Sequence, residues 1–192
     1  MDKEKEIYKN KKVCLIGCGG SLENREIEFN KYDYVVGINR IYKTKYFKNI
    51  NILYDSAHHQ FDPITNNKIR IINESNLIYY FLTPGAKSLE KLRFQEFMLK
   101  KIKVSTKTYK NRPEVKVSGK KILAGLFALN IIIGGEPFLV DIYGFDFYKK
   151  NYTSGLDFKH ELNLINKMHD LAAEEDYLNN IIDKNKYINW IK

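Results

Sequence analysis

The sequence has only two cysteines, and it has no apolar stretch long enough to cross a membrane. Cys14 and Cys18 are four residues apart on one expected strand and its turn, and two cysteines are too few for a disulfide framework. The runs "FALNIII" and "FLVDIYGF" are far shorter than the ~18 residues of a membrane span, and the lysine-rich start has no signal-peptide core. We therefore expect two reduced thiols in a soluble, cytoplasmic protein.

Several nucleotide-binding and catalytic motifs are also missing. The first glycine turn, "GCGGS" at 17–21, lacks the G-x-G-x-x-G spacing of a dinucleotide fold, and the chain has no Walker motif. It has no G-x-S-x-G elbow of a serine hydrolase. It also has no D-x-D motif, and Asp141 and Asp146 are five residues apart, so we expect no site for a divalent metal.

What the sequence does contain is an alternation of strand-like and helix-like segments. Short apolar runs that end in glycine or polar residues predict strands at 11–17, 32–39, 49–55, 69–73, 76–85 and 137–144, with a last strand or tail at 186–191. Apolar residues near helical spacing predict helices at 87–102, 122–133 and from His160 or Asn166 to Asp183, and a basic linker covers 103–121.

This alternation predicts an α/β fold, an αβα sandwich around a mostly parallel, Rossmann-like sheet. A chain of 192 residues, 44% of them hydrophobic, can bury one core, so we expect a single domain over 1–192 with a flexible leader at 1–10. Ser21 is expected to cap the helix that follows the glycine turn.

Polar and glycine-rich segments follow the expected strands. In an open α/β sheet, ligands bind beyond the carboxyl ends of the strands. The segments that fall at these ends are 17–21, 39–40, 55–59 and 144–148. We expect them to share one rim of the sheet, and this rim is the expected binding site.

The net charge of +9 leaves several partners open. Nucleic acid, a nucleotide-sugar donor and an anionic membrane surface would each suit a basic chain, and so would no partner at all, because a lysine-rich surface can simply be solvated. Charge alone does not decide among these interpretations.

The rim residues have chemistry suited to a phosphorylated ligand. Backbone amides of "GCGGS" could bind a phosphate at a helix start, although the glycines could also only permit a tight turn. Asn39 could offer an amide to a phosphate or sugar hydroxyl and Arg40 could pair with a charge, unless they form an Asx turn and a surface arginine. Asp146 could accept bonds from a ribose or base, or close a turn.

A histidine near the C-terminal helix could act as a base. The imidazole group of histidine is suited to proton transfer near neutral pH, so His169 could take a proton from a sugar hydroxyl, although a lone histidine is more often structural. Its rivals are His58, His59 and His160, and the adjacent pair does not present two zinc ligands on one helix face.

Four segments, in order, resemble the sialyltransferases, most of all the bacterial lipooligosaccharide group, with an echo of the animal enzymes. "VCLIGCGGSLE" and "YDYVVGINR" resemble the long donor-binding sialylmotif. "ILAGLFALNIIIGGEPFLVDIYGFDFY" resembles the short motif, and "HDLAAEEDYL" matches the H-x-x-x-x-E pattern of the last motif. Together they cover roughly half of the chain.

The resemblance implies a metal-independent, inverting enzyme that needs no cofactor beyond its CMP-activated sugar donor. It implies donor contacts at Gly17, Gly19, Ser21, Asn39, Asp55, Asp146 and Phe147. It further implies that His169 is the general base and that Tyr148 and Tyr152 assist the departing phosphate.

The chain also departs from the bacterial pattern. Cys18 stands where that pattern has an asparagine, and Ala124 and Gly125 fall in its T-S-G helix start without the hydroxyl. The segment at 149–168 is shorter than the bacterial lid region, so we expect a reduced lid and less exclusion of water.

The leading hypothesis is a glycosyltransferase that moves sialic acid, or a related nonulosonic acid, from a CMP donor to a glycan acceptor such as lipooligosaccharide or capsule. Nucleic acid is then no partner, whereas peripheral contact with the inner face of an anionic membrane and a homo-oligomer both stay open. The alternatives are a pterin or nucleotide pyrophosphokinase-like enzyme and a non-catalytic basic module that binds a nucleotide or glycan.

Overall fold

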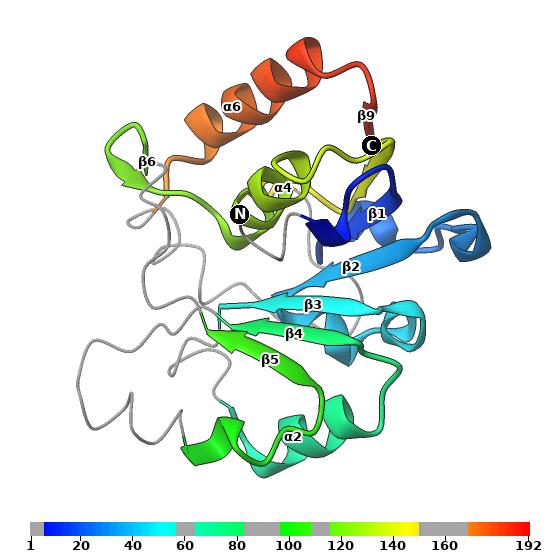
Figure 1. The fold of residues 1–192 in the computed structure, drawn as a ribbon. Coiled ribbons are helices and arrows are strands. Elements are labelled where there is room, and N and C mark those ends of the chain that lie inside the picture. Colours follow the sequence, from blue (N-terminus) through cyan, green and yellow to red (C-terminus); the bar gives the residue numbers. More distant parts are fainter. Residues whose placement is uncertain (1–5, 57–63, 83–96, 109–115, 150–168) are drawn as a thin grey trace.

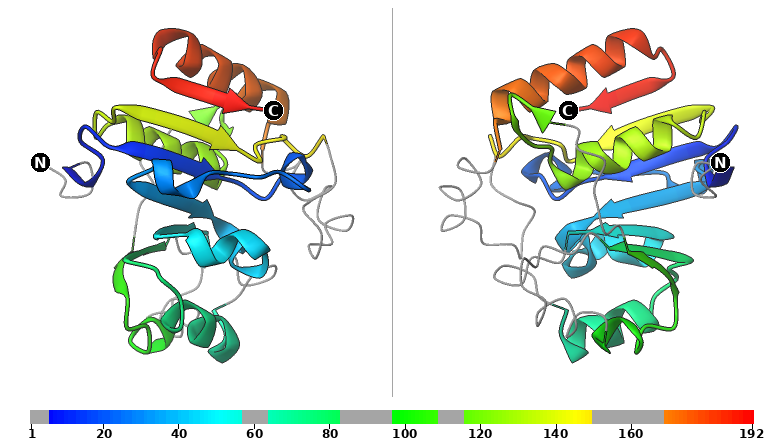
Figure 2. Two further views of the ribbon diagram at one scale, coloured as in Figure 1. Left: turned by 90° about the vertical axis from the view of Figure 1, so that its right-hand side faces the viewer. Right: turned by 60° about the vertical axis from the view of Figure 1, so that its left-hand side comes forward.

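The computed structural model describes residues 6–56, 64–82, 97–108, 116–149 and 169–192. Its centre is a seven-stranded sheet in the order β5-β4-β3-β2-β1-β8-β9. The strands are β1 (Lys12–Ile16), β2 (Tyr34–Ile38), β3 (Ile52–Asp55), β4 (Tyr79–Leu82), β5 (Ser105–Thr108), β8 (Leu139–Tyr143) and β9 (Ile188–Ile191). All neighbouring pairs are parallel, and the arrows of β1, β8 and β9 point the same way in Figure 2.

The two faces of the sheet have separate apolar cores. One face packs against α4 (Ala124–Ile133) and α6 (Leu171–Lys184), through Phe127 and Leu178 among others. The other face packs against α2 (Asn66–Asn73) and four 3-10 turns, namely η1 (Gly20–Leu22), η2 (Phe29–Lys31), η3 (Asn39–Lys43) and η4 (Lys45–Asn49). Figure 1 shows α6 and α4 at one end of the view and α2 at the other. The predicted α/β sandwich with a parallel, Rossmann-like sheet is confirmed.

Most of the predicted elements are present. β1, β2, β3, β4 and β8 lie within the predicted strand segments, α4 lies within 122–133, and 186–191 does form a strand, β9. The helix predicted up to Asp183 is α6, which begins at Leu171 with the Asp170 side chain accepting from the Ala173 N–H. The predicted start at His160 or Asn166 is therefore wrong for a continuous helix, because His169 and Asp170 are described and are not helical. Residues 150–168, and with them the expected reduced lid, lie outside the described residues. Of the helix predicted at 87–102, only 97–99 is described as helical.

Three further predictions were wrong. The segment 69–73 is the second half of α2, because Thr65 caps the helix at the Lys68 N–H and Ile69 and Ile72 face the core three residues apart. The supposed linker 103–121 contains β5 and a small hairpin of β6 (Lys116–Val117) and β7 (Lys120–Lys121). Ser21 caps no helix, because it lies inside η1, whose N-cap is Gly19.

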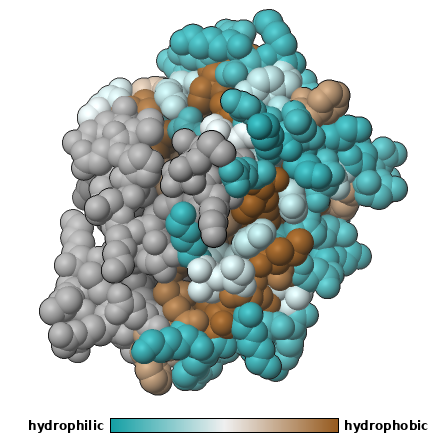
Figure 3. Space-filling model, in the orientation of Figure 1, coloured by the Kyte–Doolittle hydropathy of each residue, from teal (hydrophilic) through white to brown (hydrophobic). Residues whose placement is uncertain are grey.

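Three large hydrophobic side chains are exposed among the described residues: Ile78, Phe97 and Phe138. Ile78 precedes β4 and Phe138 precedes β8, and three strands separate β4 from β8, so these two side chains do not form one patch. Figure 3 likewise shows hydrophobic residues in several places between hydrophilic ones. Within the described parts of the chain, no helix is both long enough and apolar enough to span a membrane.

Candidate functional site

The strand order places a topological switch point between β1 and β8. From β1 the chain goes outward through β2, β3, β4 and β5, and it then returns to the other side of β1 to form β8 and β9. The connections after β1 and after β8 therefore leave the sheet in different directions, and this divergence creates the crevice where open α/β folds bind ligands. The two connections begin with Gly17 and Gly144, which the sequence placed on the expected rim.

The glycine turn after β1 is packed directly on the turn after β8. The Gly17 N–H donates to the Tyr143 carbonyl at 2.8 Å, and the Gly19 N–H donates to the Gly144 carbonyl at 2.9 Å. A Cβ atom on Gly17 would collide with the Gly144 carbonyl, and Gly144 itself has a φ of +67°. The glycines are therefore required for the close approach of two backbone segments.

Asp146 joins these two turns through its side chain. Its Oδ2 accepts from the Ser21 N–H at 2.7 Å and its Oδ1 accepts from the Ser21 hydroxyl at 2.5 Å. The Asp146 carboxylate, which was expected beside the nucleotide, thus holds the glycine turn by hydrogen bonds to Ser21. Its contact with a donor remains a prediction, and any such contact would come from a side chain whose position Ser21 already fixes.

Replacing Gly19 with alanine is expected to separate these turns. A Cβ atom there would lie 2.6 Å from Asp146 Cγ and 2.7 Å from the Gly144 carbonyl oxygen, and overpacking of this kind costs about 1–3 kcal/mol of folding free energy. Urea unfolding would measure the loss. Gly134→Ala is the control, because Gly134 has a φ of −61° that alanine adopts without strain, and equal stability of the two variants would contradict the prediction.

The chain after Asp146 has a strained backbone. Phe147 has a φ of +47° and Tyr148 a φ of +60°, in the left-handed region that bulky side chains avoid, at about 1–3 kcal/mol each. The Phe147 ring is buried edge-on against Trp190 at 5.7 Å, which holds the turn in place. Such strain collects at functional sites, so it marks the half-buried Tyr148 as a residue whose position matters. Tyr152 lies outside the described residues.

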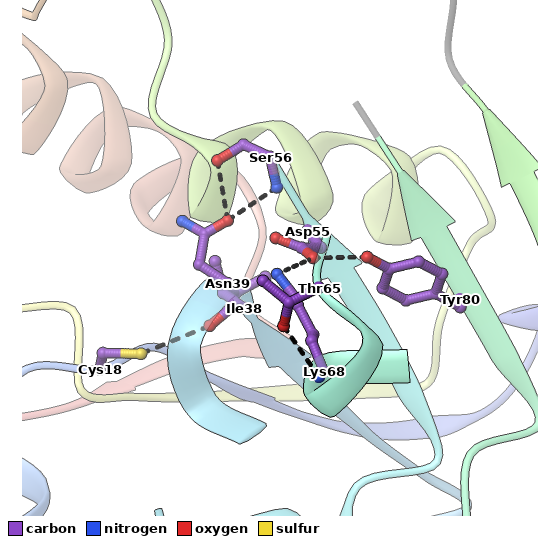
Figure 4. A network of polar contacts seen from close by, with 8 residues as sticks. All are labelled: Cys18, Ile38, Asn39, Asp55, Ser56, Thr65, Lys68 and Tyr80. Atoms are coloured by element: carbon purple, nitrogen blue, oxygen red, sulfur yellow. Dashed lines mark hydrogen bonds and ion pairs between the residues drawn. The ribbon is translucent and has the colours of Figure 1, made fainter. Parts of the chain in front are cut away.

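The turn after β2 presents an amide at the same rim. Asn39 has a φ of +51°, and its Oδ1 accepts from both the N–H and the hydroxyl of Ser56 at 2.9 Å (Figure 4). Because a backbone N–H can only donate, these bonds fix Oδ1 toward Ser56 and turn Nδ2 the other way.

Two other predicted site residues lie beside the turn after β2. The Cys18 thiol donates to the Ile38 carbonyl at 3.4 Å. Arg40 follows Asn39 in η3 and is half-buried.

Asp55, the last residue of β3, is buried. Its Oδ2 lies 2.6 Å from Lys68 Nζ and accepts from the Tyr80 hydroxyl at 2.5 Å, and only 1% of the residue is exposed. Its predicted contact with a donor is untested, and its carboxylate is engaged inside the protein.

His169 and Glu174 meet at the start of α4. His169 Nδ1 is 3.0 Å from Glu174 Oε1, and Glu174 Oε2 accepts from the Leu123 N–H at 2.8 Å. Glu174 is fully buried, whereas 14% of the His169 side chain is exposed. A carboxylate only accepts, so a neutral imidazole in this pair carries its proton on Nδ1 and has its lone pair on Nε2.

Contacts connect this pair to the glycine turn. Leu123 precedes Ala124 and Gly125, the first two residues of α4, and the Phe145 ring packs so closely on Gly125 that a Cβ there would lie 2.6 Å away. Phe145 in turn lies between Gly144 and Asp146. The structure thus brings His169, the start of α4 and the glycine turn to one rim. The rival histidines 58, 59 and 160 lie outside the described residues.

Two partners in this site were not predicted as such. Leu123 offers only a backbone N–H, which no sequence pattern reveals. Lys68 is a buried cation on the apolar face of α2. The only sequence signal for its burial was its position between Thr65, which caps the helix, and the buried Ile69.

Neither cysteine is paired, and no metal cluster is found. Cys14 and Cys18 are free and buried, and burial raises the pKa of the Cys14 thiol, which stays protonated. This confirms the expected unpaired thiols. Within the described ranges, no three histidine, cysteine or acidic side chains gather in a group that could hold a metal ion.

Comparisons with known proteins identify the fold. The chain is similar to a structure of the sialyltransferase CST-II in complex with CMP, with a TM-score of 0.61, 16% identity, and coverage of 94% of this chain and 80% of that one. It is also similar to a structure of the sialyltransferase CstII from Campylobacter jejuni in complex with the substrate analogue CMP-3FNeuAc, with a TM-score of 0.59, 15% identity, and coverage of 94% of this chain and 81% of that one. No protein-family model and no curated protein sequence matches the chain. The fold is sialyltransferase-like.

Proposed function

We propose that this chain is a glycosyltransferase that moves sialic acid, or a related nonulosonic acid, from a CMP-activated donor to a glycan acceptor, without a metal ion and with inversion at the anomeric carbon. The observation that carries the proposal is the bridge that Glu174 makes between His169 and the first turn of α4. It orients an imidazole on the rim that holds the glycine turn. The sialyltransferase-like fold supports the same activity, because the structures it resembles hold CMP or a CMP-linked analogue.

In the proposed reaction, His169 acts as the general base. Its Nε2 takes the proton of the acceptor hydroxyl while that oxygen attacks the anomeric carbon, and the bond from this carbon to the phosphate oxygen breaks. The Glu174 carboxylate accepts a hydrogen bond from Nδ1 and stabilises the imidazolium that forms, which is the role of the carboxylate in a Ser-His-Asp triad. CMP leaves with the electron pair.

Groups on the rim would stabilise the leaving phosphate. We propose that the hydrogen bonds to the phosphate come from the backbone amides of the glycine turn, from Asn39 Nδ2 and from the hydroxyls of Tyr148 and Tyr152. Among the described residues, Nδ2 of Asn39 makes no hydrogen bond to the protein, so it is available to a ligand. The acceptor, taken as lipooligosaccharide or capsule, and contact with an anionic membrane belong to the same proposal.

A nucleotide panel tests the donor assignment. CMP is expected to raise the unfolding temperature by roughly 5–10 °C at a hundredfold excess over Kd, because it binds only the folded state. UMP, GMP and AMP should have smaller effects, and magnesium should make no difference. The measurement is a thermal-shift titration of each nucleotide, and of ATP, with and without magnesium.

Each of the other outcomes contradicts the proposal in its own way. A preference for ATP with magnesium would favour a pyrophosphokinase-like enzyme. Binding of CMP with neither transfer nor hydrolysis of CMP-sialic acid would favour a non-catalytic module. Binding that is indifferent to the nucleotide but falls steeply with salt would indicate a nucleic-acid partner.

A further inference from the structure

Lys68 and Asp55 form an ion pair whose two side chains are each only 1% exposed. It is the only such doubly buried pair between Lys and Asp or Glu among the ion pairs of the described residues. The Tyr80 hydroxyl donates to the same carboxylate oxygen at 2.5 Å, and the Lys68 ammonium lies 4.8 Å from the centre of the Tyr42 ring. The pair is thus enclosed by aromatic side chains and removed from water.

Net stability does not explain a pair of this kind. Desolvation of two charges can exceed their mutual attraction, and apolar side chains of similar volume often fill such a position equally well. Buried polar pairs are retained in some proteins because they define one arrangement among several. The location of Lys68 and Asp55 shows which arrangement they could define.

The pair lies directly behind the Asn39 amide. Asp55 ends β3, and the next residue, Ser56, holds Asn39 Oδ1 with two hydrogen bonds. Lys68 comes from the first turn of α2, where the Thr65 hydroxyl accepts from the Lys68 N–H at 3.1 Å. Figure 4 shows these side chains converging on the end of β3 from α2 and β4. A shift of this strand end would move Ser56 and release the Asn39 amide.

We propose that Asp55, Lys68 and Tyr80 are positioning residues that fix the Asn39 amide in one orientation, with Nδ2 aimed at the donor. Asp55 acts through Ser56 and does not touch the donor itself. The identity of the ligand rests on the proposed function, whereas the fixed amide orientation is independent of it.

A matched pair of variants separates positioning from stability. Tyr80→Phe and Tyr32→Phe each remove a tyrosine hydroxyl that donates to a buried aspartate at 2.5 Å, on Asp55 and Asp141 respectively. Each aspartate also has a lysine nearby, since Lys31 lies 3.6 Å from Asp141. Asp141 lies inside β8, away from Ser56. The Tyr32 hydroxyl also lies 3.1 Å from the Tyr143 hydroxyl, so Tyr32→Phe should lose at least as much stability as Tyr80→Phe, whereas only Tyr80→Phe should affect the Asn39 amide.

The effect of each variant is followed by two measurements, the mobility of the Asn39 amide and the affinity for CMP. Side-chain 15N relaxation, with the Asn39 signal identified by its loss in Asn39→Ala, should show a more mobile amide in Tyr80→Phe and an unchanged amide in Tyr32→Phe. CMP affinity by calorimetry should fall by roughly three- to tenfold in Tyr80→Phe alone, as expected when one ligand hydrogen bond is weakened. The double variant Asp55→Asn/Lys68→Met, which removes both charges without leaving either unpaired, should behave like Tyr80→Phe.

Each result has a defined meaning. Equal amide mobility in Tyr80→Phe and Tyr32→Phe, or an unchanged amide in the double variant, would overturn the positioning role. Failure of the wild-type protein to bind CMP would overturn the proposed function, and the relaxation measurement would still decide whether Asp55, Lys68 and Tyr80 fix the amide.

Discussion

Replacing His169 with alanine is expected to slow sugar transfer by about 10²–10⁴-fold, which is the usual contribution of a positioned general base. The loss should appear in kcat, because the base acts on the acceptor hydroxyl. CMP binding should stay close to the wild-type value, because the proposed donor contacts lie in the turns after β1, β2 and β8. The fold should persist, since His169 precedes α6 and is partly exposed.

The measurement is CMP release from CMP-sialic acid with a panel of glycan acceptors, alongside CMP binding by calorimetry. Asp170→Asn is the control, because asparagine can still accept from the Ala173 N–H and cap α6. A folded His169→Ala variant that transfers at the rate of Asp170→Asn would remove His169 from the mechanism.

The sequence predicted the central strands because each is an apolar run that ends in glycine or polar residues. It could not reveal β5, since Ser105, Thr106 and Lys107 are exposed on an edge strand and show no apolar alternation. It placed 69–73 in the sheet because "IRIIN" also fits a strand, and only the Thr65 cap, with Ile69 and Ile72 on one helix face, decides for α2. A short apolar run fits both the helical repeat of about 3.6 residues and the strand repeat of about two residues, so the run alone does not decide between helix and strand.

The sequence could predict which segments lie together at the edge of the sheet, but it could not predict which atoms of these segments contact one another. The ends of parallel strands share one edge by geometry, so the segments at 17–21 and 144–148 could be placed together from the pattern alone. Which atoms meet there depends on distant parts of the chain. Ser21 and Asp146 are 125 residues apart, and nothing in either segment predicts that this carboxylate binds the glycine turn.

The H-x-x-x-x-E spacing singled out His169 and Glu174 through a family resemblance, and the structure adds the geometric reason for the spacing. Asp170 caps α6 and Glu174 lies in its first turn, so the acidic side chain is directed back toward the residue before the cap. The same turn brings Glu174 beneath the Leu123 N–H. The glutamate thereby sets the orientation of the histidine and the position of α4 together.

Replacing Glu174 with glutamine is expected to reduce transfer nearly as far as loss of the histidine, by about 10²–10⁴-fold, because it changes which imidazole nitrogen carries the proton. Glutamine has one acceptor oxygen. If that oxygen takes the Leu123 N–H, the amide NH₂ faces His169 Nδ1, which must then accept, and the proton moves to Nε2. The opposite orientation would leave the Leu123 N–H facing another donor.

Nitrogen NMR of the His169 ring tests this directly, because the protonated nitrogen should be Nδ1 in the wild type and Nε2 in Glu174→Gln. Glu175→Gln is the matched control, since that neighbouring side chain is paired with Lys149 and, among the described residues, makes no hydrogen bond or ion pair to the histidine or to α4. The control should keep both the activity and the Nδ1 proton. If Glu174→Gln moves the proton to Nε2 and transfer nevertheless continues at the wild-type rate, His169 Nε2 is not the base. If transfer is lost while the proton stays on Nδ1, Glu174 acts by placing the imidazole or stabilising its charge, and not by selecting its tautomer.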